Sequence, residues 1–139
     1  MDRTQLQRLL PHQGDALWID QVLGHDATCI EGLCDWSHLL KFSSLTSPAY
    51  LFEAAAQLCA AHGALHAEER ADTPPIRMAM VGKLSQLTVH NTPTERQGNV
   101  TVRAEQEALS PAGALYAFSA HAQDELLVDG KLLLVLVRD

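Results

Sequence analysis

The sequence predicts an α+β fold in which an antiparallel sheet wraps around one long central helix. The first observation is the stretch from Pro48 to about Glu68, which has strong helix formers, no further proline and apolar residues on nearly every side. A helix of a soluble protein that is apolar all round is a buried helix. The second observation is the remainder of the chain, which is typical of several strands separated by short turns. One buried helix followed by antiparallel strands favours a sheet that covers the helix.

The size and composition predict one domain over residues 1–139. A chain of 139 residues has the length of a single ordinary domain. Apolar residues make up 47% and charged residues 19%, which is a globular balance. We therefore expect one core and one functional site.

Ahead of the central helix, the sequence predicts a short helix and a hairpin. Thr4 is a suitable N-cap, and Pro11 would end the helix because proline lacks an N–H group. Apolar, aromatic and β-branched residues then favour two strands around a turn. The expected elements are a helix over 4–10, strands over 16–23 and 28–36, and a turn over 24–26.

The central helix is expected to begin at Ser47 and Pro48, which suit the N-cap and first-turn positions. After it, we expect strands over 77–90, 100–110, 114–123 and 131–138, with turn signals at 111–113 and 129–130. The run over 132–137 lacks alternation, which favours a central strand covered on both faces.

Charge and hydropathy exclude several classes of partner. The net charge is −7 and no cluster of Lys and Arg is present, which argues against nucleic acid. No apolar run approaches the roughly 20 residues of a membrane helix, and the first residues have no signal-peptide pattern. A cytoplasmic protein is therefore expected. The three cysteines lack CxxC spacing, so we interpret Cys29, Cys34 and Cys59 as reduced, mostly buried thiols.

Glu53 and Gln57 are the polar exceptions in the first half of the central helix. They are four residues apart, so they share a helix face and can contact each other or one ligand. Burying a carboxylate costs several kcal/mol unless it is paired or protonated. Glu53 is thus either a general acid with a raised pKa or a structural side chain at a helix edge.

Two further features could contribute to a site near the start of the helix. His38 lies in the segment 37–41, which we expect to be a loop that either aims this histidine at the helix or leaves it solvated. The helix N-terminus, with Pro48, Ala49 and Tyr50, is expected to offer unpaired N–H groups that could polarise a carbonyl oxygen.

The pair His62 and His66 has a spacing that can bind a metal ion. No Glu or Cys completes an obvious ligand set, so a surface or interface role is favoured and no metal site is expected.

Two motifs resemble those of the FabA/FabZ-type 3-hydroxyacyl-carrier-protein dehydratases, which have the hotdog fold. The opening residues 9–12 (LLPH) and 16–23 (ALWIDQVL) are similar to that family's "LLPHR…LLVDRVL", and residues 53–57 (EAAAQ) to its "EAxAQ" motif. Residues 116–137 are similar to its closing strands. The resemblance, which covers most of the chain, extends to dehydratase-like proteins of aryl-polyene and related polyketide assembly.

The resemblance implies an active site at a dimer interface. There, a histidine takes the α-proton of a 3-hydroxyacyl thioester, and the helix carboxylate assists loss of the hydroxyl. Glu53 matches the carboxylate and Gln57 the motif's glutamine. Pro48 and Ala49 correspond to the family's Pro-Gly pair, displaced by one residue relative to Glu53. With Tyr50 they are expected to bind substrate at the helix start, where backbone N–H groups would hold the thioester oxygen. The family's histidine precedes the glutamate by fourteen residues, a place that Leu39 occupies here, so His38 is one residue away from it.

Three functions remain open at this point. The first is a dehydratase with Glu53 as acid and His38 as base. The second is a thioesterase in which the helix carboxylate activates water, and the third is a non-catalytic subunit that pairs with an active hotdog protein. The resemblance implies no cofactor of the protein itself, because the substrate is carried on the phosphopantetheine of a carrier protein or of CoA.

The resemblance also implies two kinds of partner: an acyl carrier protein, and a second hotdog chain in a homodimer or heterodimer. An acidic carrier would be repelled by the net charge of −7, so docking requires a local basic patch. The candidates for that patch are Lys41, Arg77, Lys83, Arg96 and Arg103.

Overall fold

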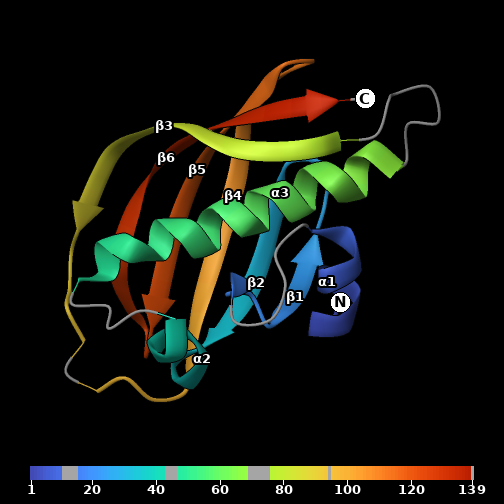
Figure 1. Cartoon of the computed structure of the whole chain (residues 1–139). Coiled ribbons are helices and arrows are strands. Elements are labelled where there is room, and N and C mark those ends of the chain that lie inside the picture. Colours follow the sequence, from blue (N-terminus) through green and yellow to red (C-terminus); the bar gives the residue numbers. More distant parts are fainter. Residues whose placement is uncertain (11–15, 43–46, 69–75, 94, 139) are drawn as a thin grey trace.

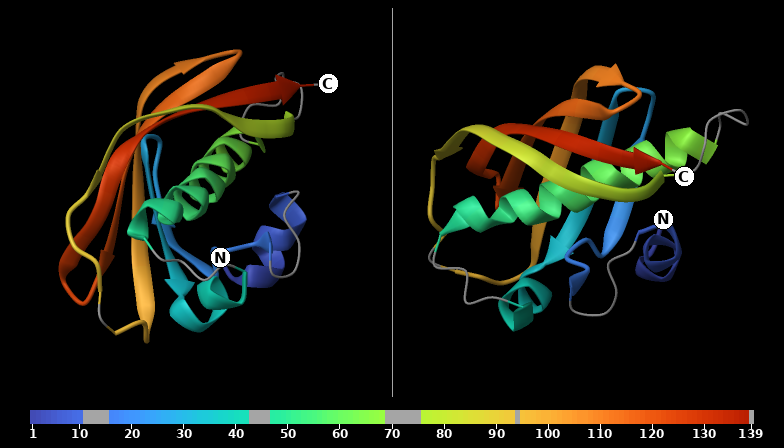
Figure 2. Two further views of the ribbon diagram at one scale, coloured as in Figure 1. Left: turned by 60° about the vertical axis from the view of Figure 1, so that its left-hand side comes forward. Right: turned by 45° about the horizontal axis from the view of Figure 1, so that its top comes forward.

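The predicted α+β architecture is confirmed. The structure is a computed structural model that describes residues 1–10, 16–42, 47–68, 76–93 and 95–138. Six antiparallel strands form one curved sheet in the order β1-β2-β4-β5-β6-β3, and α3 lies along its concave side (Figures 1 and 2). The elements are α1 (Arg3–Leu9), β1 (Gln21–His25), β2 (Cys29–Asp35), α2 (Trp36–Phe42), the 3₁₀ helix η2 (Pro48–Leu51), α3 (Phe52–Glu68), β3 (Ile76–Val89), β4 (Asn99–Ser110), β5 (Gly113–Ala122) and β6 (Glu125–Arg138).

Small side chains allow α3 to approach the sheet closely. Ala54, Ala55 and Ala61 of α3 are fully buried. Gly32 of β2 lies beneath the helix, where a Cβ atom would stand 2.9 Å from Cδ1 of Leu58. The alanine-rich sequence thus produces a buried helix through tight packing as well as through hydrophobicity.

The N-terminal part differs from the prediction at three places. Asp2, and not Thr4, caps α1, because its carboxylate accepts the N–H of Gln5 while the Gln5 side chain accepts the N–H of Asp2. Pro11 lies outside the described residues. In place of the strand expected over 16–23, β1 begins only at Gln21 and continues through Gly24 and His25 of the expected turn, so the chain turns after His25. The segment 37–41 is not a loop but part of α2.

The segment 16–18, in which Leu17 and Trp18 are buried, has a physical reason for staying out of the sheet. The side chain of Gln57 accepts the N–H of Trp18 and donates to the carbonyl of Ala16. These are the backbone groups that a strand would use in a ladder. An apolar sequence pattern therefore marks burial here without marking a strand.

Two predictions about the C-terminal strands are also corrected. The expected turn at Asp129 and Gly130 lies inside β6, and the hairpin instead turns at Gln123 and Asp124, which have φ of 51° and 65°. Gly130 serves packing, since a Cβ there would stand 3.1 Å from the Phe118 ring. The run over 132–137 lies between β5 and β3, but it is not covered on both faces, because Leu133 is 38% exposed.

Within the described parts of the chain, no helix combines the length and the apolar character needed to traverse a lipid bilayer.

Candidate active site

Glu53 and Gln57 lie one turn apart at the start of α3 and contact each other. The Nε2 of Gln57 donates to Oε1 of Glu53 at 3.2 Å. Glu53 is half-buried rather than buried, while Gln57 is only 1% exposed. The predicted pairing of these two side chains on one helix face is therefore present.

The contacts of Gln57 determine its orientation. Its Oε1 accepts the N–H of Trp18 at 2.7 Å, so its Nε2 is directed to the carbonyl of Ala16 at 2.8 Å and to Glu53. A glutamine amide with both ends bound to the chain is a positioning group. Its role in substrate binding stays a prediction, and its described hydrogen bonds hold Glu53 and the segment 16–18 against α3.

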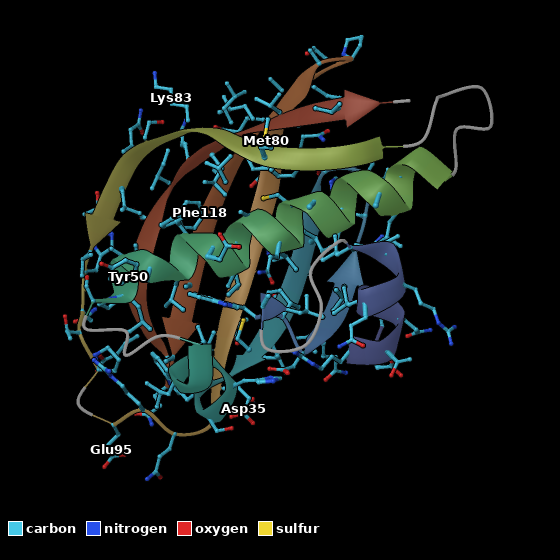
Figure 3. All side chains as sticks on the ribbon, viewed as in Figure 1. Asp35, Tyr50, Met80, Lys83, Glu95 and Phe118 are labelled. Carbon is cyan, nitrogen blue, oxygen red and sulfur yellow. The ribbon has the colours of Figure 1, made fainter. Side chains whose placement is uncertain are left out.

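The helix N-terminus differs from the expectation of unpaired N–H groups. The N–H of Ala49 donates to Oγ of Ser47 at 3.2 Å, and the N–H of Tyr50 donates to the Ser47 carbonyl at 3.3 Å. Ser47 is therefore the N-cap of η2, as its place before Pro48 predicted. Pro48 is buried, and Tyr50 is 51% exposed at this end of the central helix (Figure 3).

His38 is positioned by α2 and by an aspartate that the sequence analysis did not single out. Nδ1 of His38 lies 2.7 Å from Oδ1 of Asp20, in the segment that leads into β1. The two side chains are 20% and 26% exposed. Asp20 lies within the motif over 16–23 that resembles the dehydratases, which is the sequence signal that could have found it.

Asp20 connects three elements. Its Oδ1 also receives Nη1 of Arg3 from α1 at 3.1 Å, and its Oδ2 accepts the N–H of Asp35, at the junction of β2 and α2, at 2.7 Å. The carboxylate is thus held from two sides independently of His38.

His38 and Asp20 line a hollow of about 380 Å³. Its other described lining residues do not include Glu53 or Gln57; they are Gln21, Leu33, Asp35, Ser37 and Asn99. Within one chain, the structure brings Glu53 together with Gln57 and brings His38 together with Asp20. Pro11 and His12 of the opening motif lie outside the described residues.

His62 has both ring nitrogens bound within the protein. Nδ1 lies 2.7 Å from the hydroxyl of Tyr116, and Nε2 lies 2.9 Å from the carbonyl oxygen of Asp26. The ring of His66 lies beside it, with ring centroids 4.4 Å apart and the two planes tilted by 51°. Among the described residues, no group of three or more potential ligands is placed to hold a metal ion. His62 therefore belongs to a buried hydrogen-bond network, which corrects the surface or interface role that we expected.

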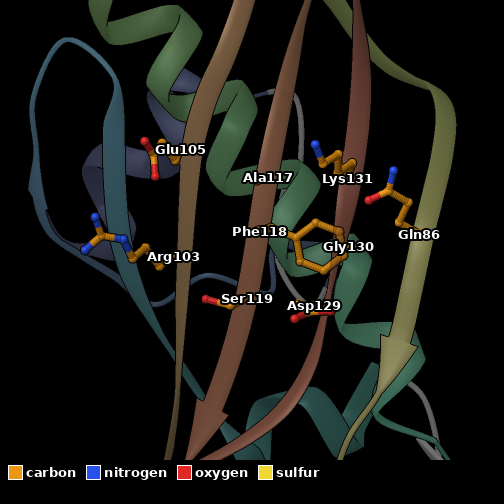
Figure 4. Close-up of a pocket in the computed structure, with 9 residues that line it drawn as sticks. All are labelled: Gln86, Arg103, Glu105, Ala117, Phe118, Ser119, Asp129, Gly130 and Lys131. Atoms are coloured by element: carbon orange, nitrogen blue, oxygen red, sulfur yellow. The ribbon is translucent and has the colours of Figure 1, made fainter.

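Two of the basic residues proposed for carrier docking can be placed on the sheet. Lys83 lies on β3, at the upper side of the molecule in Figure 3. Arg103 lines a separate hollow of about 320 Å³ with Lys131, Glu105 and Asp129, so opposite charges are mixed there (Figure 4). The side chains of Lys41 and Arg77 lie outside the described part of the structure.

Solved structures similar to this chain are small proteins of the hotdog class. The dehydratase heterocomplex ApeI:P from Xenorhabdus doucetiae matches with a TM-score of 0.83 and 14% identity, over 96% of this chain and 91% of that chain. A mutant thioesterase from Pseudomonas aeruginosa, PA1618, matches at 0.60 and 16%, over 100% and 96%. Cj0977, a virulence protein of Campylobacter jejuni, matches at 0.63 and 12%, over 98% and 89%. At these identities the likeness establishes the hotdog fold.

Comparison of the sequence itself gives the family. No significant match was found among curated proteins. A model of the ApeP-like dehydratases, however, matches residues 4–137, which span both motifs and the six strands except the last residue of β6. The chain therefore belongs to the ApeP-like dehydratase family.

Proposed function

We propose that this protein is one subunit of a hotdog pair that removes water from 3-hydroxyacyl thioesters. The observation that carries the proposal is the Glu53 carboxylate, held by Gln57 at the start of the central helix in a chain of a dehydratase family. A carboxyl group fixed in this way suits general acid catalysis, because its direction is set before the substrate arrives.

The chemistry needs two groups. A base removes the proton from the carbon next to the thioester, and an acid donates a proton to the departing hydroxyl. The C–H and C–O bonds break, a carbon–carbon double bond forms, and water leaves. In this proposal His38 is the base and Glu53 is the acid, while the thioester oxygen carries the charge that develops in the transition state.

A site completed by a partner fits three observations. His38 lines a hollow whose described lining does not include Glu53. The solved ApeI:P structure is a heterocomplex. Edge strand β3 has exposed apolar side chains at Met80 (47%) and Val81 (37%), which a partner would cover. We therefore place the complete site between this chain and a second hotdog chain.

We further propose which carrier presents the acyl substrate and in which cellular compartment the protein acts. A phosphopantetheine arm of an acyl carrier protein or of CoA would present the thioester, with the aryl-polyene and polyketide type of chain as the favoured acyl group. The described chain has its three cysteines free, which fits the reducing cytoplasm.

The test is a dehydration assay with a 3-hydroxyacyl thioester on a carrier protein. The purified chain is assayed alone and with a candidate hotdog partner, and loss of water is followed by mass. Glu53→Gln and His38→Ala variants are each expected to lower the rate of the pair by about 100-fold or more. Glu125→Gln and His121→Ala are matched controls on exposed positions, and they should retain the wild-type rate.

Each outcome separates one function from the others. Water loss abolished by both variants supports the dehydratase and its two groups. An unaltered rate in both variants, with turnover supplied by the partner, would identify the chain as a non-catalytic subunit. Release of free acid and free thiol would identify a thioesterase.

A further inference from the structure

We propose that Asp20 is the positioning residue of His38, fixing its ring in the tautomer that carries the proton on Nδ1. The inference rests on the proposed function, because it concerns the residue assigned there as the base. It assigns a role to a residue that the family motif alone does not explain.

The contact between the two side chains is short and lies in a half-buried setting. Nδ1 of His38 and Oδ1 of Asp20 are 2.7 Å apart, at the short end of the range for charge-assisted hydrogen bonds. An ionised carboxylate can only accept hydrogen bonds. Nδ1 must therefore carry the proton, and Nε2 carries the lone pair of the neutral ring. A base needs that lone pair in a defined direction.

Asp20 is itself fixed before it meets His38. Nη1 of Arg3 and the N–H of Asp35 hold its two oxygens from α1 and from the start of α2. The carboxylate therefore cannot rotate with the imidazole. Because α2 carries His38 and begins at the same junction, the ring and its acceptor are held by one local structure.

The geometry makes Asp20→Asn an informative variant. The N–H of Asp35 donates to Oδ2, and Nη1 of Arg3 donates to Oδ1, so the amide oxygen of asparagine can accept only one of them. The Arg3 side chain can turn to solvent, whereas the backbone N–H is fixed, so the amide oxygen is expected at the position of Oδ2. The amide nitrogen then faces Nδ1 of His38 as a donor. The ring must respond by placing its lone pair on Nδ1 and its proton on Nε2. A single isosteric change is thus expected to reverse the tautomer.

The control is Asp124→Asn, the same change at an exposed position of the turn between β5 and β6. Asp124→Asn should keep the wild-type tautomer and a kcat within about two-fold of the wild type. A purely structural role of Asp20 would instead leave the proton of His38 on Nδ1 in Asp20→Asn.

The first measurement is a long-range proton–nitrogen NMR correlation of the ring nitrogens at about pH 8, with His38 assigned by its loss in His38→Gln. The wild type should show Nδ1 protonated, and Asp20→Asn should show Nε2 protonated. The second measurement is the dehydration rate of the pair. Asp20→Asn should lower kcat by about 100-fold, since the base is lost, while KM changes by less than two-fold.

A wild-type ring protonated on Nε2 would overturn the proposal, and this reading does not depend on whether Asp20→Asn folds. A reversed tautomer with an unchanged kcat would overturn it as well. If the wild-type pair performs no dehydration, the proposed function fails, whereas the tautomer still decides whether Asp20 orients His38.

Discussion

At the scale of single residues, His62 lies in a chain of hydrogen bonds with one direction. A carbonyl can only accept, so Nε2 of His62 must donate to Asp26, and Nδ1 must accept from the hydroxyl of Tyr116. Nε2 of Gln106 donates in turn to the oxygen of Tyr116 at 3.2 Å. The chain ties α3 to the β1–β2 turn and to β4 and β5, and it requires His62 to be neutral.

Acidification is expected to destabilise the fold through His62. Burial lowers the pKa of His62 below its usual 6.5, and His66 and His25 nearby lower it further, while the carbonyl of Asp26 opposes the shift. Between the lowered folded pKa and about 6.5, the unfolded chain binds more protons, so stability falls as the pH falls. The free energy of unfolding should therefore drop from pH 7.5 to pH 5 through this residue.

Urea unfolding of the wild type and of His62→Gln at several pH values measures this contribution. Glutamine can donate to Asp26 and accept from Tyr116 without titrating, so the variant should be less sensitive to acid. His121→Gln, on an exposed position of β5, is the control. An equal acid dependence in wild type and His62→Gln would contradict the prediction.

At the scale of elements, the contact of β2 with α3 depends on the missing side chain of Gly32. A Cβ there would stand 2.9 Å from Cδ1 of Leu58 and 3.0 Å from the carbonyl oxygen of Gln21. Gly32→Ala should therefore destabilise the protein by about 1–3 kcal/mol. Gly24→Ala is the matched control, because nothing lies within 4 Å of its Cβ position. Thermal and urea unfolding compare the two variants, and equal stabilities would refute the packing argument.

The short helix α2 is capped at its N-terminus by Asp35. The carboxylate of Asp35 accepts the N–H of Ser37 at 2.8 Å and its hydroxyl at 2.7 Å, as an N-cap does. Asp35→Ala should lower the free energy of unfolding by about 1 kcal/mol, whereas Asp35→Asn should retain most of the stability. Denaturant unfolding tests this. A loss as large in Asp35→Asn as in Asp35→Ala would show that the cap is not the cause.

The elements that the sequence predicted best are those in which local pattern and tertiary setting agree. The buried helix, the cap at Ser47 ahead of its 3₁₀ first turn η2, and the four later strands follow from composition and turn residues. The segment 16–18 was predicted wrongly because a distant side chain, Gln57, takes its backbone groups. Gly130 was read as a turn because its packing against Phe118 is a long-range contact. Periodicity and turn signals do not report such contacts.

In the candidate site, too, the contacts that follow a local rule could be predicted and the long-range contacts could not. Glu53 and Gln57 could be paired from their spacing alone, because helix geometry fixes which side chains share a face. The contact of His38 with Asp20 joins residues eighteen positions apart, so no local rule predicts it. The capped N–H groups of Ala49 and Tyr50 were missed although Ser47 was recognised as a cap, since the cap itself occupies the donors.

At the scale of the whole molecule, the thiols should report global unfolding. Cys34 and Cys59 are fully buried, and burial raises the pKa of both thiols. The thiolate is the reactive form, so both should resist a thiol reagent in the native state, while the half-buried Cys29 reacts first. Counting modified thiols with time tests this: one fast thiol is expected in water and three in denaturant. Cys29→Ser should abolish the fast phase, and a fast phase that persists would contradict the assignment.

The order of the strands in the sheet has a consequence for the chain as it emerges from the ribosome. β3 is complete at Val89, but its partner β6 spans Glu125–Arg138 and also closes the sheet against β5. Until those residues have been translated, β3 lacks its partner strand, and the sheet that covers the apolar helix α3 is incomplete. The growing polypeptide must pass through a stage with exposed apolar surface, which is the kind of stage at which chaperones bind.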